Sequence, residues 1–189
     1  MVLKKRIIEI IYQIIPVMIG VYLGFALSNW SENKKLDKKQ EVFLSSFKKE
    51  IKSNKETILK IKDYHKLVRD SSSYYINQLD SISFNNAPKF FQGLRTQTLS
   101  ETVYNSGITS GILTHINLET TQKIGHLHNL QESYNNFNSI ALQGFINLEF
   151  EDSKKSMKRA LQYLLITMSD LSNLEEILIK EYNKVENKL

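Results

Sequence analysis

One long uncharged stretch, Ile10–Trp30, constrains the fold of this chain more than any other feature. It spans 21 residues, and its two amide side chains, Gln13 and Asn29, lie near its two ends. With a rise of about 1.5 Å per residue, a helix of this length is about 30 Å long, the thickness of the hydrocarbon core of a bilayer. A buried helix of a soluble core is disfavoured because the helix would have no polar face. The stretch therefore predicts a transmembrane helix over residues 10–30, preceded by a short basic N-terminus over residues 1–9.

A cleaved signal peptide is the main alternative to a retained anchor. The sequence Ala26-Leu27-Ser28 has the small-x-small form of a cleavage site, and the basic residues Lys4, Lys5 and Arg6 fit the start of a signal peptide. Against this interpretation, the apolar run is long for a signal peptide, and Glu9 interrupts its approach. The sequence therefore favours a retained, single-pass anchor.

Two features within the stretch suggest how it sits in a membrane. Trp30 closes the run, where an indole ring lies at the level of the lipid headgroups, so we interpret it as an interface anchor. Gly20, Gly24 and Ser28 recur every four residues and share one helical face, against which a second helix can pack closely. The alternative is that glycine is simply common in membrane helices.

The positive charge is concentrated around the apolar stretch. The chain has 25 Lys and Arg residues against 20 Asp and Glu residues, a net charge of +5. Residues 1–39 contribute +4 of this excess, which leaves +1 for the remaining 150 residues. A nucleic-acid-binding protein would carry the excess on its folded domain. We therefore expect membrane lipids as partners and no nucleic acid.

The basic flanks leave the orientation open, because three basic residues precede the span and four lysines closely follow it. A short basic segment before a first apolar helix commonly stays in the cytoplasm. We therefore expect a bacterial inner-membrane protein with a cytoplasmic N-terminus and a periplasmic C-terminal domain.

A heptad pattern follows the anchor. Apolar or aromatic residues occupy nine of twelve positions that alternate spacings of three and four. The twelve are Leu44, Phe47, Ile51, Asn54, Ile58, Ile61, His65, Val68, Ser72, Tyr75, Leu79 and Ile82. A seam of this length predicts a long helix over about residues 31–83 with coiled-coil-like packing.

The C-terminal part of the chain repeats the pattern. Ten of twelve positions are apolar: Phe150, Lys154, Met157, Leu161, Leu164, Met168, Leu171, Glu175, Leu178, Tyr182, Val185 and Leu189. Two such seams in one chain suggest helices that pack on each other. We therefore predict an all-α fold in which the transmembrane helix continues into an antiparallel bundle of long helices, forming a domain over residues 31–189 with its last helix at about 150–189.

The middle of the chain is broken into shorter pieces. Asn85-Asn86-Ala87-Pro88 is a turn signal, and Ser100-Glu101 suits the start of a short helix over about 99–105. Ser106-Gly107 and Ser110-Gly111 are expected to break the chain again. Asn117 is a candidate cap for a helix over about 118–147. Its apolar face would consist of Leu127, Leu130, Tyr134, Phe137 and Ala141.

The chain resembles a family of small membrane-anchored helical proteins of unknown function found in Bacteroidota. The resemblance rests on Asn29-Trp30-Ser31-Glu32-Asn33-Lys34 after the apolar helix and on the mid-chain element Ser106-Gly107-Ile108. It covers the first forty residues well and the middle weakly. It implies a membrane anchor and a helical domain, and it brings no reaction.

No motif for catalysis or cofactor binding is present. The chain has no cysteine, which removes disulfides, thiol catalysis and cysteine-ligated zinc. It has no phosphate-binding glycine loop and no zinc-protease or nucleophile-elbow motif. His126 and His128, two residues apart on a helix, point in nearly opposite directions and cannot easily share one ion. We therefore expect no enzyme, no cofactor and no metal site.

Asn54 and His65 are the two polar residues in the middle of the first seam. Such residues commonly fix the register between helices, which is the interpretation that we favour. The alternative is that His65 makes the packing sensitive to pH.

These features favour a structural or accessory subunit of a membrane complex that acts through protein–protein contacts. Its partners would be other subunits or a second copy. Aromatic residues near the far end of the first hairpin are candidates for that contact: Tyr74, Tyr75, Phe90 and Phe91. Ordinary packing at the end of the bundle is the simpler explanation for these residues. The alternative function is a sensor-like periplasmic bundle that binds a small ligand, but residues 1–9 leave no room for an output domain.

Overall fold

The computed structural model of the protein describes residues 2–79, 89–149 and 153–186. In these ranges the chain is all-α: it forms four α-helices and one 3₁₀-helix and contains no strand. The predicted fold class is therefore confirmed. The chain divides into two compact units, residues 1–43 and residues 44–189, which are described separately.

The first unit consists of helix alone, because α1 (Val2–Asn77) runs through all of its described residues. Large apolar side chains from Tyr12 to Trp30 are between about half and three-quarters exposed. The most hydrophobic window of this segment has no residue buried inside the protein. By length and composition α1 can cross a membrane near the N-terminus, and this is the only helix in the described part of the chain that can.

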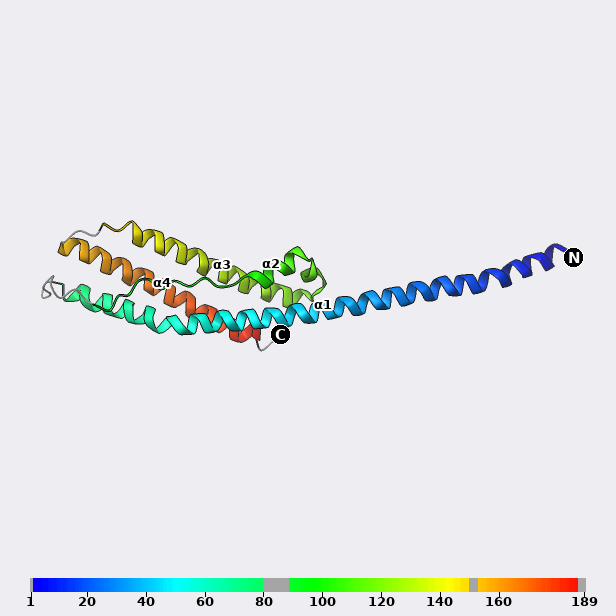
Figure 1. Ribbon diagram of the computed structural model, residues 1–189, viewed down its shortest axis with the longest axis horizontal. Coiled ribbons are helices and arrows are strands. Elements are labelled where there is room, and N and C mark those ends of the chain that lie inside the picture. The colour runs from blue at the N-terminus through cyan, green and yellow to red at the C-terminus, as the bar shows by residue number, and fades with distance from the viewer. Residues whose placement is uncertain (1, 80–88, 150–152, 187–189) are drawn as a thin grey trace. The chain divides into compact units, whose positions relative to one another are not determined.

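The second unit is a bundle of three long helices. These are the part of α1 that follows residue 43, α3 (Leu118–Ile146) and α4 (Lys154–Glu186) (Figure 1). Ion pairs join Lys55 to Glu186 and Lys66 to Glu176, so α4 runs antiparallel to α1. The hydrogen bonds from Gln131 to Tyr182 and from Tyr134 to Glu175 show that α4 also runs antiparallel to α3.

The two heptad seams form the core of this bundle. On α1, the seam positions from Phe47 to Ser72 are all buried. On α4, those from Leu161 to Val185 are buried as well, whereas Lys154 is exposed and Met157 is half-buried. The seams are therefore used within the chain. Because burying one methylene contributes about 0.8 kcal/mol, the aliphatic residues of this core are the main source of the bundle's stability.

Two short helices lead into α3. They are α2 (Thr102–Thr109) and the 3₁₀-helix η2 (Ile112–His115). Between them Gly111 adopts a φ of 70°, a left-handed conformation that glycine adopts without steric cost. Asn117 caps α3 as predicted, because its side chain accepts a hydrogen bond from the backbone N–H of Thr120. Of the predicted apolar face of α3, Leu127, Tyr134 and Ala141 are buried, and Leu130 and Phe137 are half-buried.

One of the two predicted chain breaks, at Ser106-Gly107, is wrong. The dipeptide Ser106-Gly107 lies inside α2, and the helix ends only before Ser110-Gly111. The Ser106 hydroxyl donates to the carbonyl of Thr102, one turn earlier, and Gly107 is buried. A helix continues through such a pair when tertiary packing outweighs the weak local preference of serine and glycine.

The observed helix bounds differ from the predicted bounds mainly at the ends. The predicted range 31–83 corresponds to α1, which ends at Asn77, and the range 150–189 to α4, which covers Lys154–Glu186. The predicted short helix at 99–105 corresponds to α2, three residues later in the chain. The turn signal at 85–88, Ile82, Phe150 and Leu189 lie outside the described residues.

Candidate functional site: the apolar helix and a buried polar centre

The small-residue face of the apolar helix is open. A Cβ atom added at Gly20 or at Gly24 would meet no atom within 4 Å, and the Ser28 side chain is exposed. No side chain of the first unit therefore covers this face. A second helix would meet backbone there rather than bulky side chains, the arrangement in which membrane helices pack most closely.

Trp30 ends the apolar segment beside a positive charge. Its ring is more than half exposed, and the Lys34 ammonium lies 4.2 Å from the ring centroid, one turn further along α1. At this distance the cation interacts favourably with the face of the ring. The apolar segment thus ends in an indole and a lysine, two groups that favour the headgroup layer of a membrane.

The bundle contains a buried charged pair that joins α1 to α4. His65 Nδ1 lies 2.7 Å from Glu175 Oε1, and neither side chain is exposed by more than 1%. His65 Nε2 lies 3.0 Å from the Leu94 carbonyl, which can only accept, so Nε2–H donates there. One further proton is then shared between Nδ1 and Oε1. The pair as a whole is neutral, which is the arrangement that allows a histidine and a glutamate to be buried together.

Tyr134 connects α3 to the same pair. Its hydroxyl donates to Glu175 Oε1 over 3.3 Å. Burial, and after it the nearby carboxylate of Glu175, raise the pKa of Tyr134 well above its usual value. Tyr134 therefore stays a neutral donor. Glu175 Oε2 is buried and has no hydrogen-bond partner in the described part of the chain.

An extended segment lies between α1 and α3. Residues 91–101 have no regular secondary structure, and Figure 1 shows them running along the bundle towards α2. We call residues 91–100 the strap. The backbone N–H and carbonyl groups of the strap form hydrogen bonds with side chains, whereas those of a β-strand form them with a neighbouring strand. The amide of Asn135, on α3, accepts from the Leu99 N–H and donates to the Leu99 carbonyl, at 2.8 and 3.0 Å.

Asn54 of α1 binds the next residue of the strap in the same way. Its amide accepts from the Ser100 N–H at 2.9 Å and donates to the Ser100 carbonyl at 2.8 Å. Earlier in the strap, Asn138 donates to the Gln97 carbonyl at 2.8 Å. The asparagine side chains thus satisfy backbone groups of the strap, among them those of the buried Leu99.

The start of the strap is held by aromatic and basic groups. Tyr64 donates to the Gly93 carbonyl at 2.5 Å and accepts from the Gln92 N–H at 2.8 Å. The Arg95 guanidinium lies 4.4 Å from the centre of the Tyr64 ring. Gly93 has a φ of 88° and Arg95 a φ of 51°, so the chain turns twice through the left-handed region here. The Arg95 conformation is uncommon for a residue with a Cβ.

Glu50 of α1 holds the beginning of α2. Its Oε2 accepts from the Ser100 hydroxyl at 2.7 Å and from the Val103 N–H at 3.0 Å. A carboxylate at the N-terminus of a helix satisfies free N–H groups and offsets the helix dipole. The cap of α2 therefore comes from a distant residue, because Glu101 makes no side-chain cap.

The four aromatic residues singled out from the sequence form two groups. The rings of Tyr75 and Phe90 are stacked at 5.5 Å, and Tyr74 meets Tyr75 edge-on at 5.3 Å. Phe91 contacts Phe145 of α3 at 5.2 Å. Three of the four are at least half-buried, whereas Tyr74 is 60% exposed. Ring packing within the bundle thus accounts for Tyr75, Phe90 and Phe91, and Tyr74 is the one that faces solvent.

The histidines that invited a metal interpretation lie apart. His126 is exposed, whereas His128 stacks on Tyr104 at 3.8 Å between ring centroids. His128 Nδ1 lies 3.9 Å from Glu101 Oε2, which is too long for a hydrogen bond. Within the described ranges, no three His, Asp or Glu side chains are grouped as a metal site requires.

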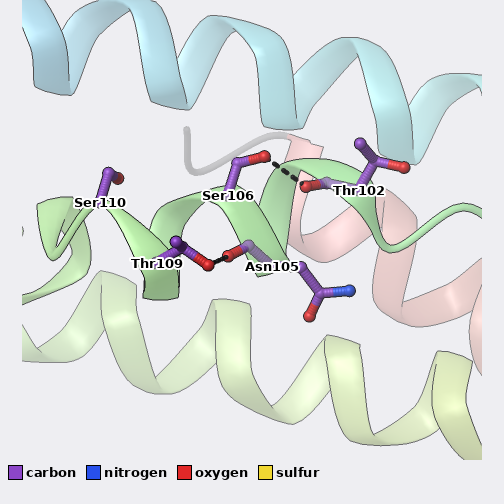
Figure 2. A pocket seen from close by; sticks show the side chains of 5 residues that line it. All are labelled: Thr102, Asn105, Ser106, Thr109 and Ser110. Atoms are coloured by element: carbon purple, nitrogen blue, oxygen red, sulfur yellow. Dashed lines mark hydrogen bonds between the residues drawn. The ribbon is translucent and has the colours of Figure 1, made fainter.

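The hollow beside α2 is open and lined by polar side chains of that helix alone. Figure 2 shows its lining residues, which are Thr102, Asn105, Ser106, Thr109 and Ser110. Three of the hydroxyls already donate to backbone carbonyls: Ser106 to Thr102 and Thr109 to Asn105 (Figure 2), and Ser110 to Gly107. Small-molecule sites are normally clefts that bury most of the ligand surface, so this open hollow is a poor candidate for one.

Compared with known proteins, the chain matches no protein-family model, no curated protein and no solved structure. The resemblance to the Bacteroidota family therefore rests on the short motifs that carry it.

Sequence reasoning missed the strap and the role of Glu175. The strap lacks the alternation of apolar and polar residues that indicates a β-strand. Its backbone forms hydrogen bonds with side chains and needs no neighbouring strand. No signal in the sequence marks the strap, because the partners of Asn54, Asn135 and Asn138 are backbone groups. Glu175 was placed in the C-terminal seam as an exception. A carboxylate in one seam and an imidazole in the other are the signal for a buried pair.

Proposed function

We propose that the protein is a single-pass membrane-anchored structural or accessory subunit that acts through contacts with other proteins. The observation that carries the proposal is the apolar segment of α1, which is exposed on all sides and has an open face at Gly20 and Gly24. In water such a surface is strongly unfavourable, whereas in a bilayer it is solvated by lipid. Its small-residue face then offers a second helix a close approach.

The bundle supports the same proposal. Its seams are filled by its own helices, so a partner would contact the outer faces. Large aliphatic side chains are exposed there, among them Ile140 and Ile146 on α3, which are 65% and 68% exposed. Tyr74 adds an exposed aromatic ring at the end of α1. Aromatic and aliphatic residues of this kind are common anchors of protein interfaces.

The proposed location is the bacterial inner membrane, with the N-terminus in the cytoplasm and the bundle in the periplasm. The support is the basic group formed by Lys4, Lys5 and Arg6 ahead of the apolar segment. A chain without cysteine also folds in an oxidising compartment without forming unwanted disulfides.

The experiment is extraction of the full-length protein, at native levels, in a mild detergent, followed by native electrophoresis and identification of copurifying proteins. The proposal predicts migration in an assembly larger than the monomer. A bundle-only chain, residues 31–189, serves as the control for contacts that need no membrane helix. Recovery of a lone monomer with a small molecule held in its bundle would instead support the sensor-like function.

One observation favours that second candidate, a bundle that binds a small ligand. Ser172 Oγ, Gln131 Oε1 and Glu175 Oε2 are buried and have no hydrogen-bond partner in the described residues. Buried polar atoms of this kind are usually satisfied by water or by a bound molecule. Mass spectrometry of the extracted protein under native conditions distinguishes a retained ligand from water.

A further inference from the structure

Four lysines form a band on α1 directly after Trp30. We call Lys34, Lys35, Lys38 and Lys39 the lysine band; all four side chains are exposed. With about 100° of rotation per residue, they fall within an arc of about 140° on the helix. The band therefore presents one positively charged side that begins one turn beyond the end of the apolar segment.

The charges of this band are not neutralised by the protein. In the described part of the chain, no carboxylate forms an ion pair with Lys35, Lys38 or Lys39. Of the nearby acidic residues, Asp37 lies outside the arc of the band, whereas Glu32 and Glu41 lie about 20° beyond its two edges. Lys34 and Lys38 are four residues apart, as are Lys35 and Lys39, a spacing at which like charges destabilise a helix. An anionic partner would remove this repulsion.

The band lies at the depth of lipid headgroups. With Trp30 at the membrane interface, Lys34 and Lys35 follow by about 6–8 Å of helix, the thickness of one headgroup layer. Lys38 and Lys39 follow Trp30 by about 12–14 Å of helix, so they lie just outside the headgroup layer. Their distance from its outer edge is less than the Debye length, which is about 8 Å at physiological salt. Their flexible stems also allow the ammonium groups to reach back towards the phosphates.

We propose that the lysine band binds anionic phospholipid headgroups in the leaflet at the C-terminal end of the span. The proposal rests on the anchoring function proposed above and adds the chemical class of lipid that surrounds the anchor. The contact between Lys34 and Trp30 supports the proposal. The Lys34 ammonium lies 4.2 Å from the centroid of the Trp30 ring, so an indole at the membrane interface places this lysine there too. Each lysine near an anionic surface strengthens binding about fivefold.

The single tryptophan of the chain provides a direct measurement. Trp30 is the only Trp, so its fluorescence reports on lipids at this one place. The full-length protein is reconstituted into phosphatidylcholine vesicles that contain increasing fractions of brominated phosphatidylglycerol or of brominated phosphatidylcholine. Quenching of Trp30 by the two lipids then gives their relative binding constants next to the band.

The proposal predicts that brominated phosphatidylglycerol binds at least fivefold better than brominated phosphatidylcholine, and that added salt weakens this preference. The variant Lys35→Gln/Lys38→Gln/Lys39→Gln keeps Lys34 beside Trp30 and should lose most of the preference. The control Lys48→Gln/Lys49→Gln/Lys52→Gln removes three exposed lysines from the bundle unit and should keep it.

Other outcomes overturn the proposal. Equal quenching by the two lipids, or an unchanged preference in the triple variant of the band, would show that the band does not select anionic headgroups. Competition by inorganic phosphate at constant ionic strength would show that the band takes free phosphate rather than lipid. Absence of quenching by either lipid would contradict the membrane anchor itself and therefore the proposed function.

Discussion

His65 and Glu175 form a buried pair, with Nδ1 and Oε1 2.7 Å apart, across the interface between α1 and α4. The same imidazole binds the Leu94 carbonyl of the strap through Nε2, at 3.0 Å. The His65 side chain thus connects α1 to α4 and to the strap. Both contacts require that each ring nitrogen faces its own partner. This arrangement specifies a single register for the bundle, because a shift of one turn would leave a charged group buried alone.

The first prediction concerns the two halves of this pair. His65→Leu should destabilise the bundle by about 3–5 kcal/mol, because it leaves the Glu175 carboxylate buried without its partner. The double variant His65→Leu/Glu175→Leu should recover part of this loss, since an apolar pair of similar volume leaves no buried charge. The rest of the loss should remain, because the Leu94 carbonyl and the Tyr134 hydroxyl stay without the partners that they have in the wild type. The free energy of unfolding is measured by circular dichroism in denaturant, on the full chain in detergent.

The neighbouring pair Lys66–Glu176 is the control for this prediction. Its side chains are 36% and 61% exposed, and it joins the same two helices. The hydrogen bond between them lowers the pKa of Glu176 and raises that of Lys66. Because solvent screens an exposed pair, Lys66→Leu should change the stability little. If the double variant loses as much stability as His65→Leu does, packing volume and not charge matters at this site.

The second prediction concerns the strap. Asn135→Ala should destabilise the bundle by about 1–3 kcal/mol, because it leaves the buried N–H and carbonyl of Leu99 without partners. Amide hydrogen exchange at Leu99 should become faster in this variant. Asn135→Asp keeps an acceptor for the Leu99 N–H, so it should preserve the protection of that amide. The exposed neighbour Asn136→Ala is the matched control. Unchanged exchange at Leu99 in Asn135→Ala would contradict the proposed role of the amide.

The seams made the helices predictable from the sequence. Residues such as Ile51, Ile58, Leu171 and Leu178 repeat at the spacing of one helical face, and burial of that face determines which residues form the core. The end of α1 was less predictable, because a helix end depends on caps and tertiary contacts that involve few residues. The Ser106-Gly107 error has the same origin: local preference is weak, and the packing of α2 decides the outcome.

The polar centre was predictable only in part. Asn54 and His65 stood out because they interrupt an apolar seam, and both do bind across the bundle. Their partners are far away in sequence: Ser100 and Leu94 contribute backbone groups, which carry no sequence signal. Glu175 is 110 residues from His65, and no spacing rule connects the two. Pairing of this kind depends on the three-dimensional register of the helices, which a single sequence does not specify.

The third prediction concerns alkaline pH. Burial is the largest cause of the raised pKa of both Tyr134 and Tyr182, whose ordinary value is 10.0. Above pH 10 the unfolded chain releases the phenolic protons and the folded chain keeps them, so stability falls as pH rises. Each tyrosine should steepen this fall by about 1.4 kcal/mol per pH unit.

Unfolding midpoints measured between pH 9 and pH 11 in about half-unit steps check this prediction. Tyr182→Phe should have a shallower fall than the wild type, although it also loses the hydrogen bond from Gln131, 3.0 Å long, and starts from a lower stability. Tyr74→Phe, which removes an exposed hydroxyl, is the control and should keep the steep slope. Parallel slopes for the wild type and Tyr182→Phe would show that the buried phenol does not contribute.

The last prediction concerns the open face of the apolar helix. Gly24→Leu should leave the protein folded, because a side chain at Gly24 meets no atom of the chain within 4 Å. In a membrane the same side chain should separate α1 from a neighbouring helix and weaken that association about tenfold. Ala26→Leu is the matched control, since it adds similar bulk to the opposite face of the helix.

Association is measured in mild detergent by native electrophoresis and in vesicles by energy transfer between labelled copies. Gly24→Leu should shift the protein towards a smaller species, while Ala26→Leu should keep the assembly of the wild type. If Gly24→Leu and Ala26→Leu behave alike, the small-residue face makes no specific contact. If only a chain that begins near Asn29 is recovered from the membrane fraction, the apolar segment is a cleaved signal, and the partner must bind the bundle instead.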